Sequence, residues 1–133
     1  LRQFIEAGAR FTFVVRADDE SSAFIRAEAA KLGIADCGIV ELQAPTDGQA
    51  TSALLAADHI ANQDAPMLIY NIDTFVHPDA LAPASVRGDG WIPCFDAPGE
   101  AWSFAAADET GRVSEVREKK RISNHATIGL YWF

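Results

Sequence analysis

The sequence predicts a single mixed α/β domain that is parallel in its first half and more antiparallel in its second half. Helical and extended patterns alternate over residues 11–60, and an unbroken apolar run follows at 67–70. From residue 88 onward, extended segments are separated by turn-forming clusters. Alternating strands and helices are typical of a parallel sheet with right-handed crossovers. Strands joined by short turns are typical of antiparallel pairing.

In the first half, apolar residues recur at helical spacing in three segments, with short apolar runs between them. Gly8 and Gly33 end the first two helical patterns, as glycine does just past a helix. The third pattern places Leu54 and Leu55 toward a core, and the run at 67–70 suits a strand buried on both faces. In order, we expect helices at 1–8, 21–32 and 49–60, and strands at 11–15, 37–42 and 67–70.

In the second half, four extended segments carry few helical signals. Two clusters rich in Asp, Pro and Gly, at 96–99 and 108–111, indicate hairpin-type turns. We expect strands at 90–95, 101–107, 113–118 and 126–133.

The composition of the chain excludes some classes of function. The 133 residues include 19 acidic and 11 basic side chains, a net charge of -8. A nucleic-acid binder needs a basic stripe, so we expect no nucleic-acid partner. Two cysteines with no metal-ligand spacing favour a reduced, cytoplasmic protein. The sequence has no signal peptide and no apolar stretch of about 18 residues, so we expect no membrane span.

Both ends of the sequence are apolar. Leu1 lies inside a helical pattern and Phe133 inside an apolar run, whereas natural termini usually fray into polar residues. We therefore expect one domain, 1–133, truncated at both ends. A sheet that lacks a strand exposes an edge, which favours self-association into a homo-oligomer.

The first candidate site is the polar loop at 46–51, which opens the third helix. Gly48 lets another group approach the backbone closely, and a helix N-terminus offers N–H donors to an anion or a base edge. An ordinary cap, with Asp47 capping the helix and Gln49 solvated, explains the same residues.

The second candidate site follows the apolar run, where Asn71 and Asp73 stand. Open α/β sheets bind ligands at the carboxyl ends of their strands. Asp73 therefore indicates either a Mg²⁺ ligand, since Mg²⁺ takes one or two carboxylates with substrate phosphates and water, or a turn Asp. His77 and Asp79 could add metal ligands, but Pro78 favours a turn that opens the next helix.

The third candidate site lies at the end of the 113–118 segment. The Glu118 carboxylate can hold sugar hydroxyls, and the Lys119 ammonium can hold a phosphate as a point charge. A solvated run of mixed charge explains the same residues. Gly129 within a strand indicates close approach of a ligand or another backbone.

In this order the three segments resemble the sugar-phosphate nucleotidyltransferases, which join a sugar 1-phosphate to a nucleoside triphosphate and release pyrophosphate. The resemblance runs from about residue 11 to residue 133 and rests on residues 48–50, 70–73, 118–119 and 127–131. Residues 102–104 and 122–124 resemble a bacterial subgroup associated with capsule or surface polysaccharide synthesis.

The resemblance implies a three-layer, Rossmann-like nucleotide-diphospho-sugar transferase core. It implies that Asp73 binds Mg²⁺ and is catalytic together with Lys119. The implied substrate-binding residues are Gly48 and Gln49 for the base, Glu118 for sugar hydroxyls, Lys119 for the sugar phosphate, and Asn71 and Gly129 near the ribose or sugar.

The chain also departs from the family. The glycine-rich loop that holds the triphosphate has no counterpart before Phe11, the second metal-binding Asp would fall after Phe133, and Thr74 stands where the family has a glycine-loop residue. We therefore expect the full-length protein to be an enzyme and this chain alone to be inactive. Two alternatives stay open, a glycosyltransferase of the related fold and a non-catalytic sugar-nucleotide-binding domain. The triplet at 71–73, Asn-Ile-Asp, counts against the glycosyltransferase. Such enzymes normally carry two carboxylates separated by one residue at this strand end, and this triplet has one.

Overall fold

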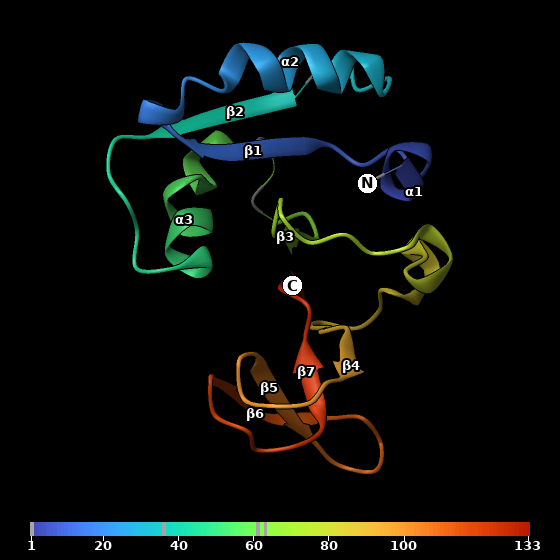
Figure 1. Cartoon of the computed structure of the whole chain (residues 1–133). Coiled ribbons are helices and arrows are strands. Elements are labelled where there is room, and N and C mark those ends of the chain that lie inside the picture. Colours follow the sequence, from blue (N-terminus) through green and yellow to red (C-terminus); the bar gives the residue numbers. More distant parts are fainter. Residues whose placement is uncertain (1, 36, 61, 63) are drawn as a thin grey trace. The chain divides into compact units, whose positions relative to one another are not determined.

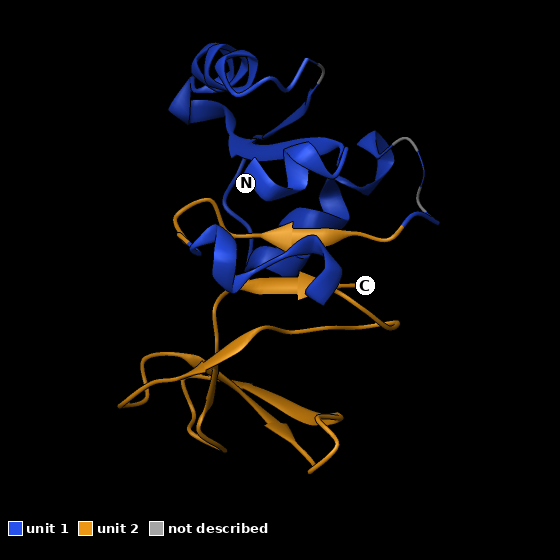
Figure 2. Cartoon of the chain, turned by 90° about the vertical axis from the view of Figure 1, so that its right-hand side faces the viewer, with its two compact units in different colours: residues 1–65, 76–85 blue, residues 66–75, 86–133 orange. Residues whose placement is uncertain are grey.

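The computed structural model describes residues 2–35, 37–60, 62 and 64–133. The chain forms two compact units, which Figure 2 distinguishes by colour. The first unit contains residues 1–65 and 76–85, and the second contains residues 66–75 and 86–133. The chain therefore enters the second unit, returns briefly to the first, and then completes the second.

The first unit contains a two-stranded parallel sheet. β1 (Phe11–Arg16) pairs with β2 (Cys37–Leu42), and α2 (Ser22–Lys31) connects them, as the alternating pattern predicts. Figure 1 shows α2 running along this strand pair. Ala29 of α2 is buried together with Ile34 and Cys37, and Ile5, Phe11, Phe13 and Ile39 pack against them. The other elements of this unit are α1 (Arg2–Glu6), η1 (Ala17–Asp19), α3 (Gln49–Leu55), η2 (Ala57–His59), η3 (Pro78–Ala80) and η4 (Pro83–Ser85).

Two expectations about the helices need correction. The helix predicted at 49–60 ends earlier, because α3 stops at Leu55 and a short 3-10 turn follows. Leu54 and Leu55 were expected to face the core, but they are 75% and 55% exposed. Helical spacing identifies an apolar stripe and does not show what covers it. The helix predicted at 1–8 is present as α1, and Leu1 lies outside the described residues.

In the second unit, the apolar run at 67–70 forms β3 (Leu68–Tyr70), which is antiparallel to β8 (Leu130–Trp132). Met67 and Phe133 extend this pairing, because each donates its N–H to the carbonyl of the other, at 2.9 and 3.0 Å. The strand is half-buried. The expectation of a parallel strand buried on both faces is therefore wrong, since an apolar run predicts burial but does not identify the partner strand.

The rest of the second unit is a four-stranded antiparallel sheet in the order β4-β7-β5-β6. All four strands are labelled in Figure 1. The predicted segment 126–133 is split between β7 and β8. The turn predicted at 96–99 does not close a hairpin, because β7 lies between β4 and β5. The strands are β4 (Cys94–Asp96), β5 (Ser103–Ala107), β6 (Val113–Glu118) and β7 (His125–Thr127).

One face of this sheet carries a buried cluster. Phe104 and Ala126 are completely buried with Ala97, and Ile122 packs against them. The Arg121 guanidinium lies 5.2 Å from the centre of the Phe104 ring and donates hydrogen bonds of 2.8 and 2.9 Å to the carbonyls of residues 97 and 99. Arg121 therefore ties the loop after β4 to the core.

The turn predicted at 108–111 joins β5 to β6 and is built around Asp108. One oxygen of its carboxylate accepts hydrogen bonds from the Thr110 hydroxyl at 2.6 Å and from the N–H groups of Thr110 and Arg112 at 2.9 and 3.0 Å. The Thr110 hydroxyl is the main cause that lowers the pKa of Asp108 below its usual value, and backbone N–H groups add to the effect. The prediction of a turn at this position is confirmed.

Candidate functional site

The candidate base-binding loop lies in the first unit, where Gly48 precedes α3. The Gly48 backbone is extended, a conformation open to any residue, so the glycine is not required for backbone geometry. Its carbonyl accepts hydrogen bonds from the hydroxyls of Thr46 and Ser52, at 3.1 and 3.2 Å. A Cβ added at Gly48 would meet no atom within 4 Å. The surface over this glycine is therefore open to a flat group such as a base, and Gln49 follows it as the first residue of α3.

The candidate metal ligand Asp73 lies in the turn after β3 in the second unit, and its side chain is exposed. A carboxylate is a suitable ligand for Mg²⁺. Among the described residues, no three or more His, Cys, Asp or Glu side chains gather into a group that could hold a cation. The described residues therefore form no protein cage for a cation, and a single carboxylate would leave most positions around an ion to other ligands.

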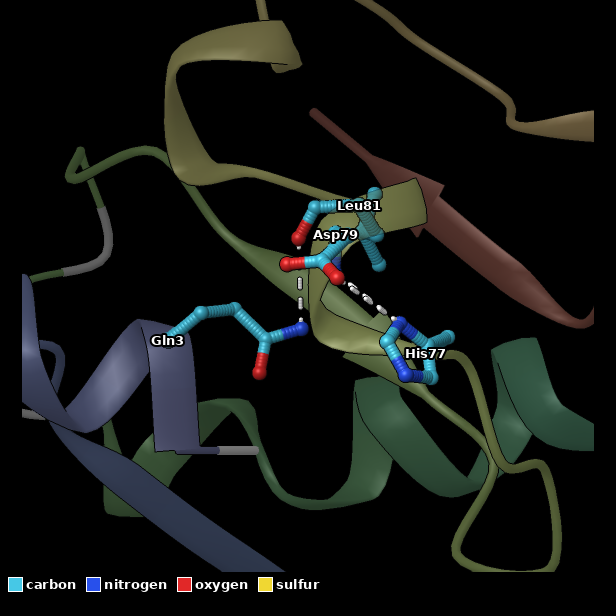
Figure 3. A network of polar contacts seen from close by, with 4 residues as sticks. All are labelled: Gln3, His77, Asp79 and Leu81. Carbon is cyan, nitrogen blue, oxygen red and sulfur yellow. Dashed lines mark hydrogen bonds and ion pairs between the residues drawn. The ribbon is translucent and has the colours of Figure 1, made fainter.

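His77 and Asp79 were considered as further ligands, and Figure 3 shows their arrangement. The His77 ring accepts the N–H of Asp79 at 3.4 Å and lies 3.4 Å from its carboxylate, with Pro78 opening η3 between them. The Gln3 side chain nearby donates to the Leu81 carbonyl at 3.2 Å. These contacts describe a local cap of a short helical turn, which confirms the preferred interpretation of this segment.

Asn71 and Gly129 are brought into direct contact in the second unit. The Asn71 N–H donates to the Gly129 carbonyl at 3.3 Å. Gly129 has a φ of 77°, and a Cβ at this position would lie 3.1 Å from Cγ of Asn71 and closer still to its amide nitrogen. Gly129 was expected inside a strand, but it lies between β7 and β8. The expected close approach is present, and the group that approaches is the Asn71 side chain.

Glu118 and Lys119 lie at the end of β6, in the second unit. Lys119 has a left-handed backbone with a φ of 50°, which is uncommon for residues other than glycine. Its N–H donates to the Trp102 carbonyl at 3.0 Å. The Lys119 ammonium lies 3.3 Å from the Glu118 carboxylate, and the two side chains are 73% and 75% exposed. The pair is therefore accessible to an anionic or polyhydroxyl ligand.

The structure brings together some of these residues and not others. Asn71 contacts Gly129, and Glu118 contacts Lys119. In the described part of the chain, no hydrogen bond or ion pair joins Asp73 to Glu118 or Lys119. Ser103 was noted in the sequence only as part of the segment 102–104, and the structure places it opposite Glu118 across β5 and β6. Strand register reveals this pair, and register cannot be read from a serine in the sequence.

The fold belongs to the mixed α/β class, with a small parallel sheet early in the chain and antiparallel sheets later. None of the protein-family models searched matches the chain, and neither does any curated protein. Among the described residues, no helix is long and apolar enough to cross a membrane.

One solved structure makes the relationship specific. The chain matches the crystal structure of the nucleoside-diphosphate-sugar pyrophosphorylase from Vibrio cholerae RC9 with a TM-score of 0.80 and 34% sequence identity. The match covers 99% of this chain and 57% of the pyrophosphorylase, so the chain spans a little over half the length of its relative. The resemblance inferred from the sequence is confirmed, and the chain is related to this pyrophosphorylase.

Proposed function

We propose that the chain is part of a sugar-phosphate nucleotidyltransferase, which joins a sugar 1-phosphate to a nucleoside triphosphate and releases pyrophosphate. The observation that carries the proposal is the match to a nucleoside-diphosphate-sugar pyrophosphorylase over 99% of the chain at 34% identity. The enzyme would work in the cytoplasm and supply nucleotide sugars for surface or capsular polysaccharide synthesis. Its core would be a three-layer, Rossmann-like sheet completed by residues of the longer protein.

In this reaction, an oxygen of the sugar phosphate attacks the α-phosphorus of the triphosphate. The bond between the α- and β-phosphates breaks, and pyrophosphate leaves. Catalysis then depends mainly on positioning the two substrates in line and neutralising charge. A bound Mg²⁺ would supply charge neutralisation at the phosphates, and Asp73 is the residue of this chain that would hold it.

The other residues take roles that suit their chemistry. Gly48 leaves room for the base beside the backbone, and Gln49 offers an amide to its edge. Lys119 would hold the sugar phosphate as a point charge, while Glu118 would accept hydrogen bonds from sugar hydroxyls. Asn71, held against Gly129, would contact the ribose or sugar. Asp73 and Lys119 are the two proposed catalytic residues.

Ligand-induced thermal stabilisation of the 133-residue chain tests the proposal. Nucleoside triphosphates and nucleotide sugars are compared with and without Mg²⁺. A ligand at about 100 times its dissociation constant stabilises the folded state by about 2.7 kcal/mol, which raises the melting temperature by roughly 10 °C in a domain of this size. We expect a Mg²⁺-dependent shift that is lost in Asp73→Ala and retained in Asp89→Ala, a matched exposed acid in the same unit.

A second variant tests the base-binding loop. Gly48→Ala should leave the melting temperature of the free chain almost unchanged, because the backbone is extended and the space is open. It should weaken nucleotide binding, because the added methyl group occupies the surface where the base would lie. Equal melting shifts for all ligands in Asp73→Ala, Gly48→Ala and the unmodified chain would contradict these assignments. Binding of nucleotide sugars without pyrophosphate release by the longer protein would favour a non-catalytic binding domain, whereas transfer of the sugar to an acceptor would favour a glycosyltransferase.

A further inference from the structure

β6 forms one edge of the four-stranded sheet in the second unit, and among the described residues β5 is its one strand partner. All six residues of β6 are exposed, and the apolar side chain of Val116 in its middle is 42% exposed. An edge strand presents a row of backbone N–H and C=O groups that can pair with a further strand. The outer edge of β6 is therefore a candidate surface for a partner that is itself extended.

The hydrogen bonds between β5 and β6 show which backbone groups face this outer edge. The Lys119 N–H donates to the Trp102 carbonyl at 3.0 Å, so these two residues form a hydrogen-bonded pair. Such pairs alternate with non-hydrogen-bonded pairs in an antiparallel ladder, and the register is regular over residues 115–118. Glu115 and Arg117 therefore turn their backbone groups toward β5, whereas Val116 turns its N–H and C=O toward the outer edge.

The charges of β6 alternate in sign along one face of the strand. Glu115 and Arg117 are two residues apart, so they share a face, and their side chains form an ion pair. The carboxylate side chain is 44% exposed and the guanidinium side chain is 57% exposed, so both remain accessible from the outer edge. A partner strand that carries the same two charges in the opposite direction would continue the alternation. An antiparallel copy of β6 carries them in that direction.

A second copy of β6 meets this condition in one antiparallel register. When Val116 stands opposite Val116 of the second copy, the two valines exchange backbone hydrogen bonds, and Glu115 of each copy stands opposite Arg117 of the other. Because the outward-facing backbone groups recur at every second residue, the nearest alternative registers are shifted by two residues. One of them sets Glu115 against Glu115, and the other sets Arg117 against Arg117. Like charges directly opposite each other destabilise a strand pair.

Charged residues and bulges also protect edge strands from unwanted pairing, and β6 has a register shift where it passes Ala106 and Ala107. Charges of a single sign would give this protection against every partner, a second copy included. The alternating signs of β6 instead leave one self-complementary register open and disfavour strands that lack the matching order of charges. Charge complementarity therefore favours a second copy of the chain over an unrelated strand.

We propose that two copies of the chain pair through their β6 strands, antiparallel about a two-fold axis at Val116, so that their sheets join into one continuous sheet. The two-fold axis makes the contact isologous, and the pair between Glu115 and Arg117 therefore occurs twice. The four charged side chains form a square of alternating sign. The contact involves little more than two strand edges, so the dimer is weak and depends on concentration. This inference goes beyond the proposed function and does not depend on it.

Sedimentation velocity of the 133-residue chain over a concentration series tests the proposal. A reducing buffer prevents a disulfide between copies through the exposed Cys94. Glu115→Arg and Arg117→Glu each replace two attractive pairs by two repulsive ones. The variant that carries both exchanges restores the alternation and keeps the net charge of the unmodified chain. Glu109→Arg and Arg87→Glu are matched controls, because both residues are exposed and lie outside the strands of the second unit.

We expect each single exchange at 115 or 117 to raise the dissociation constant of the dimer about tenfold or more, because attraction becomes repulsion at two positions. The double variant and the two controls should associate as the unmodified chain does. In NMR spectra of the unmodified chain, the amide signals of residues 115–118 should shift with concentration. Melting temperatures establish that each variant is folded.

Three results would overturn the inference. The unmodified chain could remain monomeric throughout the concentration series. The single exchanges in β6 could leave the association unchanged, or weaken it no more than the controls do. The double variant could associate no better than the single exchanges, which would show that the charges do not set the register of the pairing. None of these results bears on nucleotide binding, which thermal stabilisation measures separately.

Discussion

The contact between Gly129 and Asn71 gives the sharpest prediction about stability. Gly129→Ala adds one methyl group to a residue whose φ is 77°. The new Cβ would lie 3.1 Å from Cγ of Asn71. It would lie still closer to the Asn71 amide nitrogen, at a separation that Cβ atoms in real structures essentially never show. The substitution therefore combines a backbone cost with a side-chain collision, and the two can be measured separately.

The expected magnitude is the sum of these two costs. A left-handed backbone costs a residue with a Cβ roughly 1–2 kcal/mol. Forcing a neighbouring side chain out of its place costs about 1–3 kcal/mol more, as in other overpacked sites. Gly129→Ala should thus destabilise the chain by about 2–5 kcal/mol in total.

Urea unfolding of four chains measures both parts: the unmodified chain, Gly129→Ala, Asn71→Ala and the double variant. In the Asn71→Ala background the amide and Cγ are absent, so Gly129→Ala should cost only the backbone share of roughly 1–2 kcal/mol. The coupling free energy between the two sites should be about 1–3 kcal/mol. Its sign should make the double variant less destabilised than the sum of the two single variants, because the collision is absent from it. If the slope of the unfolding free energy against urea concentration is the same for all four chains, the variants differ in stability alone.

Gly111→Ala is the matched control, because its φ is 85° and a Cβ there would meet no atom within 4 Å. This substitution should lower the free energy of unfolding by the backbone cost alone, roughly 1–2 kcal/mol. The reasoning is refuted if Gly129→Ala costs the same with and without the Asn71 side chain, or if it costs no more than Gly111→Ala.

Three further predictions follow from other contacts in the structure. Arg121→Lys should destabilise the chain by about 1–3 kcal/mol in urea unfolding, because an ammonium cannot replace the guanidinium's hydrogen bonds to two loop carbonyls and to Asn124 at 2.8 Å; no loss would contradict it. Asp108→Asn should lower the melting temperature at neutral pH, and the difference should shrink as the pH falls below about 4, because a depressed pKa stabilises the fold only while the carboxylate is ionised. Iodoacetamide should label Cys94 slowly at neutral pH, because this exposed residue is still partly desolvated and the desolvation raises the pKa of its thiol; the buried Cys37 should be labelled only after unfolding. Equal rates for the two thiols in mass spectra would be the contrary result.

Local patterns in the sequence predicted much of the secondary structure. The strand–helix–strand order of the first unit and the turn around Asp108 follow from apolar spacing and turn chemistry, and both are present. The sequence predicted less well which strands pair with each other. The apolar run in β3 gave no sign that its partner would be the antiparallel β8, some 60 residues further along, because burial and partner choice depend on distant strands.

The candidate site shows the same division between local and distant information. Adjacent residues such as Glu118 and Lys119 could be paired from the sequence, and Gly129 could be marked for close approach. The approaching group, Asn71, and the cross-strand neighbour Ser103 became visible only through strand register. A serine or an asparagine carries no periodic signal of its own, so sequence patterns could not place either one beside its contact.

The segment between β7 and β8 joins two parts of the second unit that the proposed reaction uses. Thr127 ends β7, and Gly129, two residues later, holds Asn71 at the end of β3, shortly before Asp73. In-line attack requires the sugar and the phosphates to be held at a fixed distance from each other. A short segment that joins the residues contacting them would help to fix that distance. Gly129→Ala moves Asn71 and should alter this spacing. We therefore expect it to weaken hexose 1-phosphate binding at temperatures where the variant is still fully folded, whereas Gly111→Ala should not. Equal affinity of the two variants for glucose 1-phosphate, measured by NMR titration, would show that this link positions nothing for the ligand.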